Sequence, residues 1–303
     1  MDNIFIVDES TDHIRIDKYL NELLPDQSRS YIQKLLKDGH ILVNNSIIKP
    51  NYKVKADDRI QIDIPEPIEA NIEAENIPLD IIYEDNDVLI VNKPKEMVVH
   101  PAPGNYSGTL VNALMYHCKN SLSNINGVLR PGIVHRIDKN TTGCLIVCKN
   151  DQSHNFVADQ LSEHSINRIY VGIVCGVLKD DEGMIDAPIG RNKRDRKLMS
   201  VNEDGKRAIT HYKVLKRFRD YTLVQFKLET GRTHQIRVHM AHINHPLLGD
   251  DQYGRQKCKF NLTGQCLHAK TIGFIHPSTK EYVEFEVDEP EYFKHLLDIL
   301  EEQ

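Results

Sequence analysis

An acidic residue surrounded by basic ones is the first candidate for chemistry in this chain, in the segment His135-Arg136-Ile137-Asp138-Lys139. Arg136 precedes Asp138 by two residues and Lys139 follows it, and nearby positive charges favour the ionised form of a carboxylic acid. Asn, Thr and Gly residues at 140–143 predict a tight turn between two apolar runs, and loops on rigid scaffolds often carry catalytic residues. An ionised carboxylate in such a loop can attack or stabilise an electron-poor carbon. The alternative role for Asp138, when this segment is taken by itself, is to cap the turn.

Size and composition limit the classes of protein to which the chain can belong. Its 303 residues are 40% hydrophobic, which is enough for one large domain and one small one. No segment holds the roughly 20 apolar residues that span a bilayer, and the first ten residues lack the order of a signal peptide. We therefore expect a cytoplasmic protein without membrane contact. The six cysteines include no Cys-x-x-Cys pair, which favours buried thiols over a metal site.

The distribution of charge says more about binding partners than the total does. The formal net charge of −6 argues against a nucleic-acid partner, because phosphate binding requires a basic surface. Between Arg191 and Arg219, however, eleven Lys and Arg residues stand against three Asp and Glu, a balance of +8. Residues 15–63 carry nine basic residues against seven acidic ones. A basic stripe on an acidic body is compatible with RNA binding, while residues 191–197 by themselves are equally consistent with a solvated loop.

Hydrophobic periodicity and composition divide the chain into three parts. They are a small domain, an acidic linker with three prolines, and a large domain: residues 1–64, 65–78 and 79–303. In the small domain, apolar residues at helical spacing predict two short helices, the second capped by Ser28 and ended by Gly39. Two predicted strands flank a hairpin turn at Asn44-Asn45: residues 41–43 and 54–64.

The large domain contains more predicted strands than helices, and several strands adjoin through short turns. We predict strands at residues 81–84, 88–91, 144–148, 166–176, 209–215, 221–228, 265–275 and 282–287. We predict helices at residues 109–117, from residue 151, after an N-terminal cap at Thr233, and after Pro290. This order is typical of an α+β domain with a mixed, mostly antiparallel sheet flanked by helices. No glycine-rich dinucleotide motif or phosphate loop is present, so no nucleotide cofactor is expected.

Four ordered motifs resemble those of the RluA/RluD family of pseudouridine synthases. They are Asn92-Lys93-Pro94 with Val99-His100-Pro101, then His135-Arg136-Ile137-Asp138, then Arg168-Ile169-Tyr170, then Gly231-Arg232-Thr233-His234-Gln235-Ile236-Arg237. The match covers nearly all of the chain from Leu79 onward, and the run after Val99 is similar to that of RluD-type members. The small domain resembles the RNA-binding domain of ribosomal small-subunit protein four. The resemblance implies a synthase that acts without a cofactor on structured RNA, most similar to the branch for large-subunit ribosomal RNA.

The resemblance assigns the central chemistry to Asp138. Conversion of uridine to pseudouridine breaks the bond from ribose C1′ to the base nitrogen, rotates the base and joins C1′ to base carbon 5. A sugar that loses its base becomes oxocarbenium-like, and a carboxylate can attack or stabilise such a centre. One carboxylate can suffice, because uracil leaves as a stabilised anion and is retained. By the same resemblance, Arg237 is the ionic partner of Asp138, through a guanidinium that matches a carboxylate at two points.

The resemblance also gives other side chains a role at the RNA. It implies that Tyr170 stacks on the target base and takes part in its proton transfer. Arg136 fills the gap that remains when the uridine is flipped out of its stack. Lys139, Arg232 and His234 are expected to contact phosphate or sugar. Basic side chains of the small domain are expected to bind RNA as well: Arg15, Lys18, Arg29, Lys34 and Lys37.

Two other functions compete with this interpretation. His239 and His242 lie at i and i+3 of one predicted helix, a usable spacing for a metal-dependent hydrolase, but surface or core histidines explain them better. We therefore expect no metal. The other function is that of a ribosome-assembly factor that binds ribosomal RNA without catalysis, and the joint presence of Asp138, Tyr170 and Arg237 argues against it. Without a heptad or an exposed apolar repeat, a monomer is expected.

Overall fold

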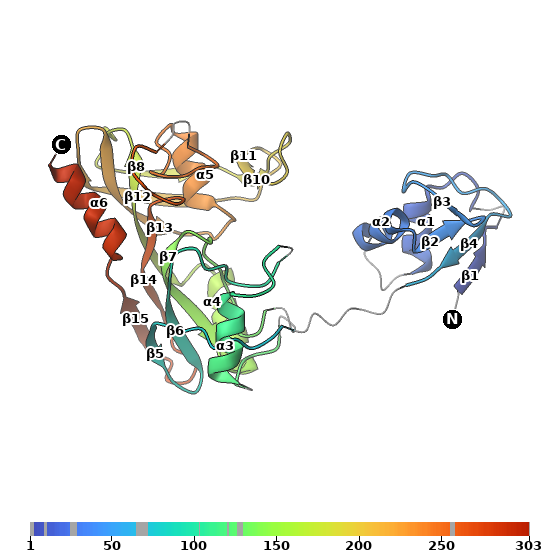
Figure 1. Cartoon of the computed structure of the whole chain (residues 1–303), viewed down its shortest axis with the longest axis horizontal. Helices are drawn as coiled ribbons and strands as arrows, with labels where there is room; N and C mark the ends of the chain where they lie inside the picture. Colours follow the sequence, from blue (N-terminus) through green and yellow to red (C-terminus); the bar gives the residue numbers. More distant parts are fainter. Residues whose placement is uncertain are drawn as a thin grey trace. The chain divides into compact units, whose positions relative to one another are not determined.

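The chain folds into two units, each with its own sheet and buried core (Figure 1). A computed structural model describes residues 3–8, 11–24, 29–64, 72–102, 104–119, 121–125, 130–254 and 258–302. Contacts within the chain separate the small unit, Met1–Glu69, from the large unit, Ala70–Gln303.

The small unit packs two helices against an antiparallel sheet of order β1-β4-β2-β3. Its elements are β1 (Asn3–Ile6), α1 (Ile16–Leu23), α2 (Arg29–Asp38), β2 (Ile41–Val43), β3 (Ser46–Ile47) and β4 (Arg59–Ile62). Both predicted helices are confirmed, and α2 ends where Gly39 has a φ of 82°. Asn44 and Asn45 have positive φ in the β2–β3 turn, as two-residue hairpin turns require. Ser28, the predicted cap of α2, lies outside the described residues.

Three strands of the small unit differ from the prediction. Strand β3, which follows the Asn44-Asn45 turn and pairs with β2, was not predicted. The strand predicted at residues 54–64 is confined to β4, because a turn precedes it. In that turn the Lys55 N–H and the Tyr52 hydroxyl donate to the Asp58 carboxylate over 2.8 and 2.9 Å. Strand β1, which pairs with β4, was not predicted. Its apolar run Ile4-Phe5-Ile6 does not alternate with polar residues, so the sequence lacks the period of two that marks a half-buried strand.

The large unit is built on a nine-stranded sheet of order β5-β6-β7-β14-β8-β13-β12-β9, with β15 paired to β14. Its strands are β5 (Ile81–Glu84), β6 (Val88–Lys93), β7 (Thr142–Cys148), β8 (Asn167–Cys175), β9 (Glu182–Asp186), β12 (Ile209–Arg217), β13 (Tyr221–Leu228), β14 (Leu267–Ile275) and β15 (Tyr282–Glu286). All of the strand pairs are antiparallel except β7 with β14. This confirms the predicted α+β class and its mostly antiparallel mixed sheet.

Helices cover both faces of this sheet, as predicted. They are α3 (Leu110–Cys118), α4 (Asp151–Ser162), α5 (Gln235–His242) and α6 (Glu291–Glu301). Helices α3 and α5 pack on the face of the sheet that carries Leu145 and Phe226. Helices α4 and α6 pack on the other face, which carries Ile146 and Ile173. Successive strand residues point to opposite faces, which separates these layers. Cys144 and Cys148 lie buried on the same face of β7, as expected.

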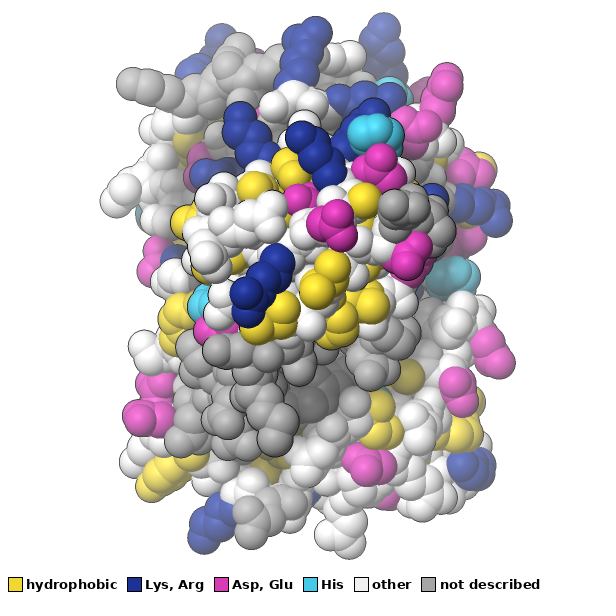
Figure 2. All heavy atoms as spheres, turned by 90° about the vertical axis from the view of Figure 1, so that its right-hand side faces the viewer, with side chains coloured by type: hydrophobic (Ala, Val, Ile, Leu, Met, Phe, Trp, Pro, Cys, Tyr) yellow, Lys and Arg dark blue, Asp and Glu magenta, His cyan; other side chains and the backbone are white. Residues whose placement is uncertain are grey.

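A basic hairpin, residues 189–201, was not predicted and lies beside α5 (Figure 1). It consists of β10 (Ile189–Arg191) and β11 (Met199–Val201), and Ile189 packs with Val238 of α5. Its loop carries most of the basic residues of the 191–197 stretch, and these side chains are exposed, so the stretch is a solvated loop on a hairpin that packs against α5. In the space-filling view of Figure 2, Lys and Arg side chains gather toward the top of the face that is drawn.

The second half of the predicted linker packs onto the large unit. Ile72 is buried in its core, and the Glu73 carbonyl accepts a hydrogen bond from Asn112 Nδ2 of α3 over 2.8 Å. The first half, residues 65–71 with Pro65 and Pro67, lies outside the described residues.

Candidate active site

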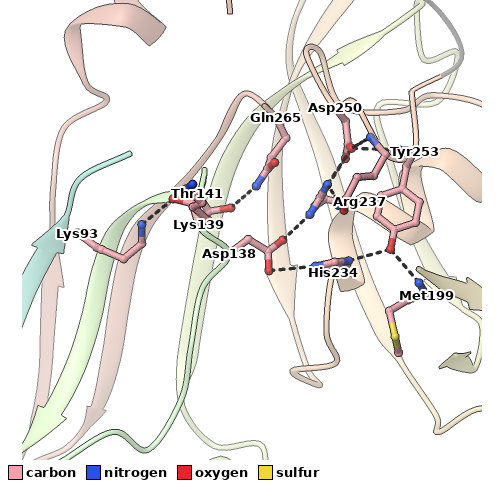
Figure 3. Close-up of polar contacts among 11 residues, drawn as sticks. Lys93, Asp138, Lys139, Thr141, Met199, His234, Arg237, Asp250, Tyr253 and Gln265 are labelled. Carbon is pink, nitrogen blue, oxygen red and sulfur yellow. Dashed lines mark hydrogen bonds and ion pairs between the residues drawn. The ribbon is translucent and has the colours of Figure 1, made fainter. Parts of the chain in front are cut away.

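Asp138 and Arg237 lie side by side in the large unit, although 99 positions separate them in the sequence (Figure 3). Arg237 Nη1 donates to Asp138 Oδ2 over 3.1 Å. Asp138 belongs to the loop before β7, and Arg237 to the first turn of α5. Together with Tyr170 they line a cavity of about 480 Å³. That volume is typical of a site for one small ligand.

The guanidinium fork of Arg237 faces a carboxylate that the sequence interpretation missed, Asp250. Arg237 Nε and Nη2 donate to the two Asp250 oxygens over 2.7 and 2.9 Å. Asp138 therefore receives one N–H and not the expected two-point contact. The Asp250 side chain is fully buried, and the exposed fractions of the Arg237 and Asp138 side chains are 5% and 18%. Burial lowers the pKa of Arg237, but the hydrogen bonds and charges of Asp250 and Asp138 outweigh it and raise that pKa above its ordinary value.

The start of helix α5 also differs from the prediction. The helix begins at Gln235 after His234, whose φ of 55° is left-handed, and no side chain caps it, so Thr233 is not the cap. A cation in the first turn is opposed by the helix dipole. The two carboxylates on Arg237 compensate for this unfavourable position. The acidic turn Asp250-Asp251, which follows Gly249, was the sequence signal that would have pointed to the buried partner.

A tight turn fixes the backbone that carries Asp138. The Thr141 N–H donates to the Asp138 carbonyl over 3.0 Å, so the turn spans residues 138–141 and not the predicted 140–143. Gln265 Nε2 donates to Thr141 Oγ1 over 2.9 Å. At Gly143 the φ is 109°, and a Cβ would lie 2.2 Å from the Ala269 carbonyl oxygen. Glycine is therefore required where this loop enters β7.

Lys93 holds the same loop from the other side (Figure 3). This residue, at the end of β6, is fully buried and donates to three backbone carbonyls, those of Pro94, Met97 and Lys139, over 2.7, 2.9 and 3.0 Å. Burial lowers the pKa of Lys93 to about 7, against the opposing effect of the Asp138 charge. The contact with the Lys139 carbonyl ties the residue after Asp138 to the sheet.

The cavity has an aromatic side chain and a buried cation in its lining. Tyr170 on β8 is 8% exposed, and burial raises the pKa of Tyr170 to about 12, so its phenol is protonated at neutral pH. Arg168, two residues earlier, is 7% exposed and donates to the Glu229 carbonyl over 3.0 Å. Within the described part of the chain no carboxylate lies at ion-pair distance from Arg168. Burial lowers the pKa of Arg168. The cavity can therefore accept a planar ring and negative charge.

His100 holds the side chain of Arg136 beside the cavity. Arg136 is exposed, lines the cavity, and has its Nη1 at 3.4 Å from His100 Nε2. Burial, followed by the charges of Arg136 and Arg130, lowers the pKa of His100 to about 4. His100 is thus neutral at pH 7 and can accept a hydrogen bond from Arg136. A guanidinium tethered by one nitrogen keeps its planar face available for stacking.

His234 lies next to Asp138, closer to the chemistry than a phosphate or sugar contact requires. Its Nε2 is 3.8 Å from Asp138 Oδ1, and its Nδ1 is 2.8 Å from the hydroxyl of Tyr253. Burial lowers the pKa of His234, partly offset by the Asp138 charge. The Tyr253 ring also lies 5.0 Å from the Arg237 guanidinium carbon. Tyr253 was not identified from the sequence, where it stands in a polar turn without a motif.

The other predicted RNA contacts lie at varied positions. Arg232 lines the cavity and donates to the Arg207 carbonyl over 2.9 Å, whereas the exposed side chain of Lys139 is not among the lining residues. In the small unit three predicted side chains are exposed: Lys18, Lys34 and Lys37. Arg15 and Arg29 are half-exposed and both donate to the buried carboxylate of Asp17.

The histidines of α5 do not form the ligand pair of a hydrolase. His239 is fully buried, with Nδ1 2.9 Å from Thr210 Oγ1 and Nε2 2.9 Å from the Ala187 carbonyl. Both ring nitrogens are thus engaged, while His242 is exposed. His239 is the satisfied core histidine that the sequence favoured.

Comparison with known proteins connects this geometry to a family. Residues 87–242, which include Asp138, Tyr170 and Arg237, match the model for RNA pseudouridylate synthase. The chain belongs to the RNA pseudouridine synthase family. Residues 14–60 match the S4 domain, so the small unit of this synthase is an RNA-binding domain. Both matches confirm the family and the N-terminal domain expected from the motifs, and the chain is an isomerase that acts on RNA.

Relatives of the synthase match it over nearly its whole length. An uncharacterised RNA pseudouridine synthase of Bacillus subtilis, YlyB, is 54% identical over 94% of each chain. Ribosomal large subunit pseudouridine synthase D of Zymomonas mobilis is 45% identical over 94% of this chain and 93% of its own. The fold is similar to that of human RNA pseudouridylate synthase domain containing 1, with a TM-score of 0.59, 23% identity and coverage of 78% and 98% of the two chains. No helix in the described ranges is both long and apolar enough to cross a membrane.

Proposed function

We propose that this synthase isomerises specific uridines of large-subunit ribosomal RNA, with Asp138 acting at ribose C1′ of a flipped-out nucleotide. The 45% identity to a ribosomal large subunit pseudouridine synthase D supports this class of RNA. The observation that carries the mechanism is the environment of Asp138. Its Oδ2 accepts the Arg237 N–H over 3.1 Å, while its Oδ1 has no hydrogen-bond partner among the described residues. One oxygen is thus fixed, and the other remains available to the sugar.

The reaction exchanges one bond of C1′ for another. As the bond from C1′ to N1 breaks, its electron pair leaves with uracil and C1′ becomes electron-poor. Asp138 Oδ1 attacks or stabilises that carbon, as carboxylates do in glycoside chemistry. After the uracil turns, its C5 forms the new bond to C1′, C5 loses its proton and N1 gains one. No atom and no electron is gained or lost overall.

The side chains around Asp138 fit the needs of the detached uracil. Tyr170 is a protonated phenol that borders the cavity, which suits stacking on the base and hydrogen-bond donation. Arg168 is a buried cation that lines the same cavity without a carboxylate partner in the described ranges, which suits the negative charge of the leaving uracil. These two residues retain and orient the base while it turns.

The other basic residues, at the cavity and in the small unit, extrude the uridine and bind the surrounding RNA. Flipping costs a few kcal/mol, less in a loop than in a duplex, and the stacking face of Arg136 offsets part of that cost. Arg232 and Lys139 contact the neighbouring phosphates or sugars. The small unit binds structured RNA through Lys18, Lys34 and Lys37, together with Arg15 and Arg29.

The decisive variant is Asp138→Asn, which keeps the shape of the side chain and removes its charge. Ribosomal RNA from cells that lack the protein identifies the substrate uridines, and cells that express either version show which one restores them. We expect wild type to restore large-subunit sites, and Asp138→Asn to bind the same RNA without forming pseudouridine. Restoration by the variant would refute the role of Asp138. Loss of sites only in small-subunit or transfer RNA would refute the proposed substrate.

A further inference from the structure

A continuous chain of contacts joins the basic hairpin to Asp138 (Figure 3). The Met199 N–H of β11 donates to the hydroxyl oxygen of Tyr253 over 3.0 Å. That hydroxyl is 2.8 Å from His234 Nδ1, and His234 Nε2 lies 3.8 Å from Asp138 Oδ1. The chain reaches the oxygen of Asp138 that Arg237 does not hold. Two side chains therefore link a backbone amide of the hairpin to the reactive carboxylate.

One tautomer of His234 completes this chain of contacts, the one in which Nδ1 accepts the Tyr253 proton. The Tyr253 oxygen accepts from Met199, and its own proton is available to the nearby Nδ1 of His234. In a neutral imidazole one nitrogen accepts and the other donates, so Nε2 is then the protonated nitrogen. The N–H of Nε2 is therefore on the side of Asp138 Oδ1. Loss of the Tyr253 hydroxyl would free the ring to adopt the other tautomer.

The hairpin combines an anchored base with an exposed basic loop. Its base packs on α5 through Ile189 and Val238, and Met199 and Tyr253 pack against the same cluster. Its loop presents Arg194 and Lys197, both exposed, which are suited to phosphate contacts. Met199 lies six or fewer residues from every basic residue of the loop. Met199 is also the residue that donates to Tyr253.

We propose that Tyr253 and His234 form a positioning bridge that couples contact between RNA and the basic hairpin to the orientation of Asp138. The bridge rests on the role proposed for Asp138. A hydrogen bond between N–H and O spans about 2.9 Å, so His234 has about 1 Å to move before it donates to Oδ1. Catalytic hydrogen bonds commonly tighten when substrate binds. RNA on the hairpin closes this gap and holds the free oxygen of Asp138 toward C1′.

Tyr253→Phe tests the bridge, because it removes the hydroxyl and keeps the ring beside Arg237. On an RNA fragment that contains a mapped substrate uridine, we expect kcat to fall by about tenfold, which is a barrier increase of about 1.4 kcal/mol. KM should stay unchanged, because the Tyr253 hydroxyl contacts Met199 and His234 and the variant removes no basic side chain. Tyr212→Phe, a hydroxyl deletion on β12 outside the bridge, is the matched control and should behave as wild type. Thermal unfolding of each variant reports whether folding is preserved.

A double-mutant cycle tests the coupling itself. The hairpin variant Arg194→Gln/Lys197→Gln should raise KM and lower kcat in the wild-type background. In the Tyr253→Phe background it should raise KM only, because the connection to Asp138 is already cut. Additive losses in kcat, or a Tyr253→Phe variant with wild-type kcat, would overturn the bridge. Asp138→Asn measured in parallel separates the two proposals: if it is inactive while Tyr253→Phe is normal, only the bridge fails.

Discussion

Removal of the Asp250 charge is the most informative perturbation of the site, because it changes the hydrogen bonds of Arg237 and leaves the Asp138 side chain itself unaltered. In wild type, Arg237 makes two hydrogen bonds to Asp250, over 2.7 and 2.9 Å, and one to Asp138. Asp250→Asn keeps one acceptor but turns an amide N–H₂ toward the guanidinium. Arg237 is then free to turn its fork to Asp138 and to bind both of its oxygens. The oxygen proposed to meet C1′ would be sequestered.

The expected magnitudes follow from burial and from the partners that remain. Loss of one member of a buried ion pair costs about 3–5 kcal/mol. Because Gln252 and Asp138 still accept from Arg237, the lower end is appropriate. For a domain of this size, about 3 kcal/mol corresponds to a Tm decrease of roughly 6–12 °C. We expect the rate of the chemical step to fall by about 10- to 100-fold, equivalent to about 1.4–2.7 kcal/mol.

Calorimetry and single-turnover kinetics measure these two effects separately. With enzyme in excess over an RNA fragment, the rate of pseudouridine formation reports the chemical step without product release. Asp251→Asn is the control, since Asp251 is the exposed neighbour in the same turn. A wild-type rate for Asp250→Asn would refute the claim that Asp250 orients Arg237. An equal loss in both variants would mean that the effect comes from the turn and not from the buried pair.

Two further predictions concern buried charges away from Arg237. Lys93→Met should lower the free energy of unfolding by about 3 kcal/mol and should also lower kcat, because three backbone carbonyls lose their donor and the Lys139 backbone is released. Denaturant unfolding and turnover of this variant test the prediction, and wild-type values would refute it. In the small unit, burial raises the pKa of Asp17, but hydrogen bonds from Arg15, Gln33 and Arg29 lower it overall from 3.8 to about 2. The stabilisation is thus present above pH 4 and lost as pH falls toward 2. This stabilisation amounts to about 1–2 kcal/mol after screening of the half-exposed guanidinium groups. Hydrogen exchange of α1 and α2 should show the pH dependence in wild type but not in Asp17→Asn.

The fold could be predicted where hydrophobic residues recur at a regular spacing, or where a residue type that caps a helix or forms a turn marks the end of an element. Strands β5 and β13 begin and end as predicted, and Thr109 caps α3 with a reciprocal hydrogen bond to Asn112. The missed elements lack such signals. Strand β1 is apolar after Asn3, and β3 has only two residues. Strand β9 is charged at both ends, and β10 and β11 are three-residue strands on either side of a charged loop. The pairing of these strands depends on contacts with distant elements such as β4, β12 and α5, which no local pattern encodes.

The site could be predicted only as far as its motifs extend. Asp138, Arg237 and Tyr170 belong to motifs, and the fold brings them to one cavity. Asp250 and Tyr253 belong to a turn after α5 that has no motif, and their contact with Arg237 arises because this turn folds back over the first turn of the helix. Lys93 was in a quoted motif, but its contact with the Lys139 carbonyl joins segments 46 residues apart. A sequence identifies which groups are charged, and tertiary structure decides which of them share a proton or a partner.

The sharing of Arg237 between two carboxylates has a chemical consequence for the whole reaction cycle. With both carboxylates ionised, Asp138, Arg237 and Asp250 carry a net charge of −1, opposite to the positive charge that develops at C1′. If Asp138 captured C1′ as an ester, its charge would disappear, and a buried Arg237 with no other partner would be left uncompensated at a cost of several kcal/mol. Asp250 prevents this, because its two hydrogen bonds keep Arg237 neutralised whether Asp138 is free or bound. The pair can therefore remain in place while charge moves between Asp138 and the sugar, and the site avoids reorganisation during the chemical step.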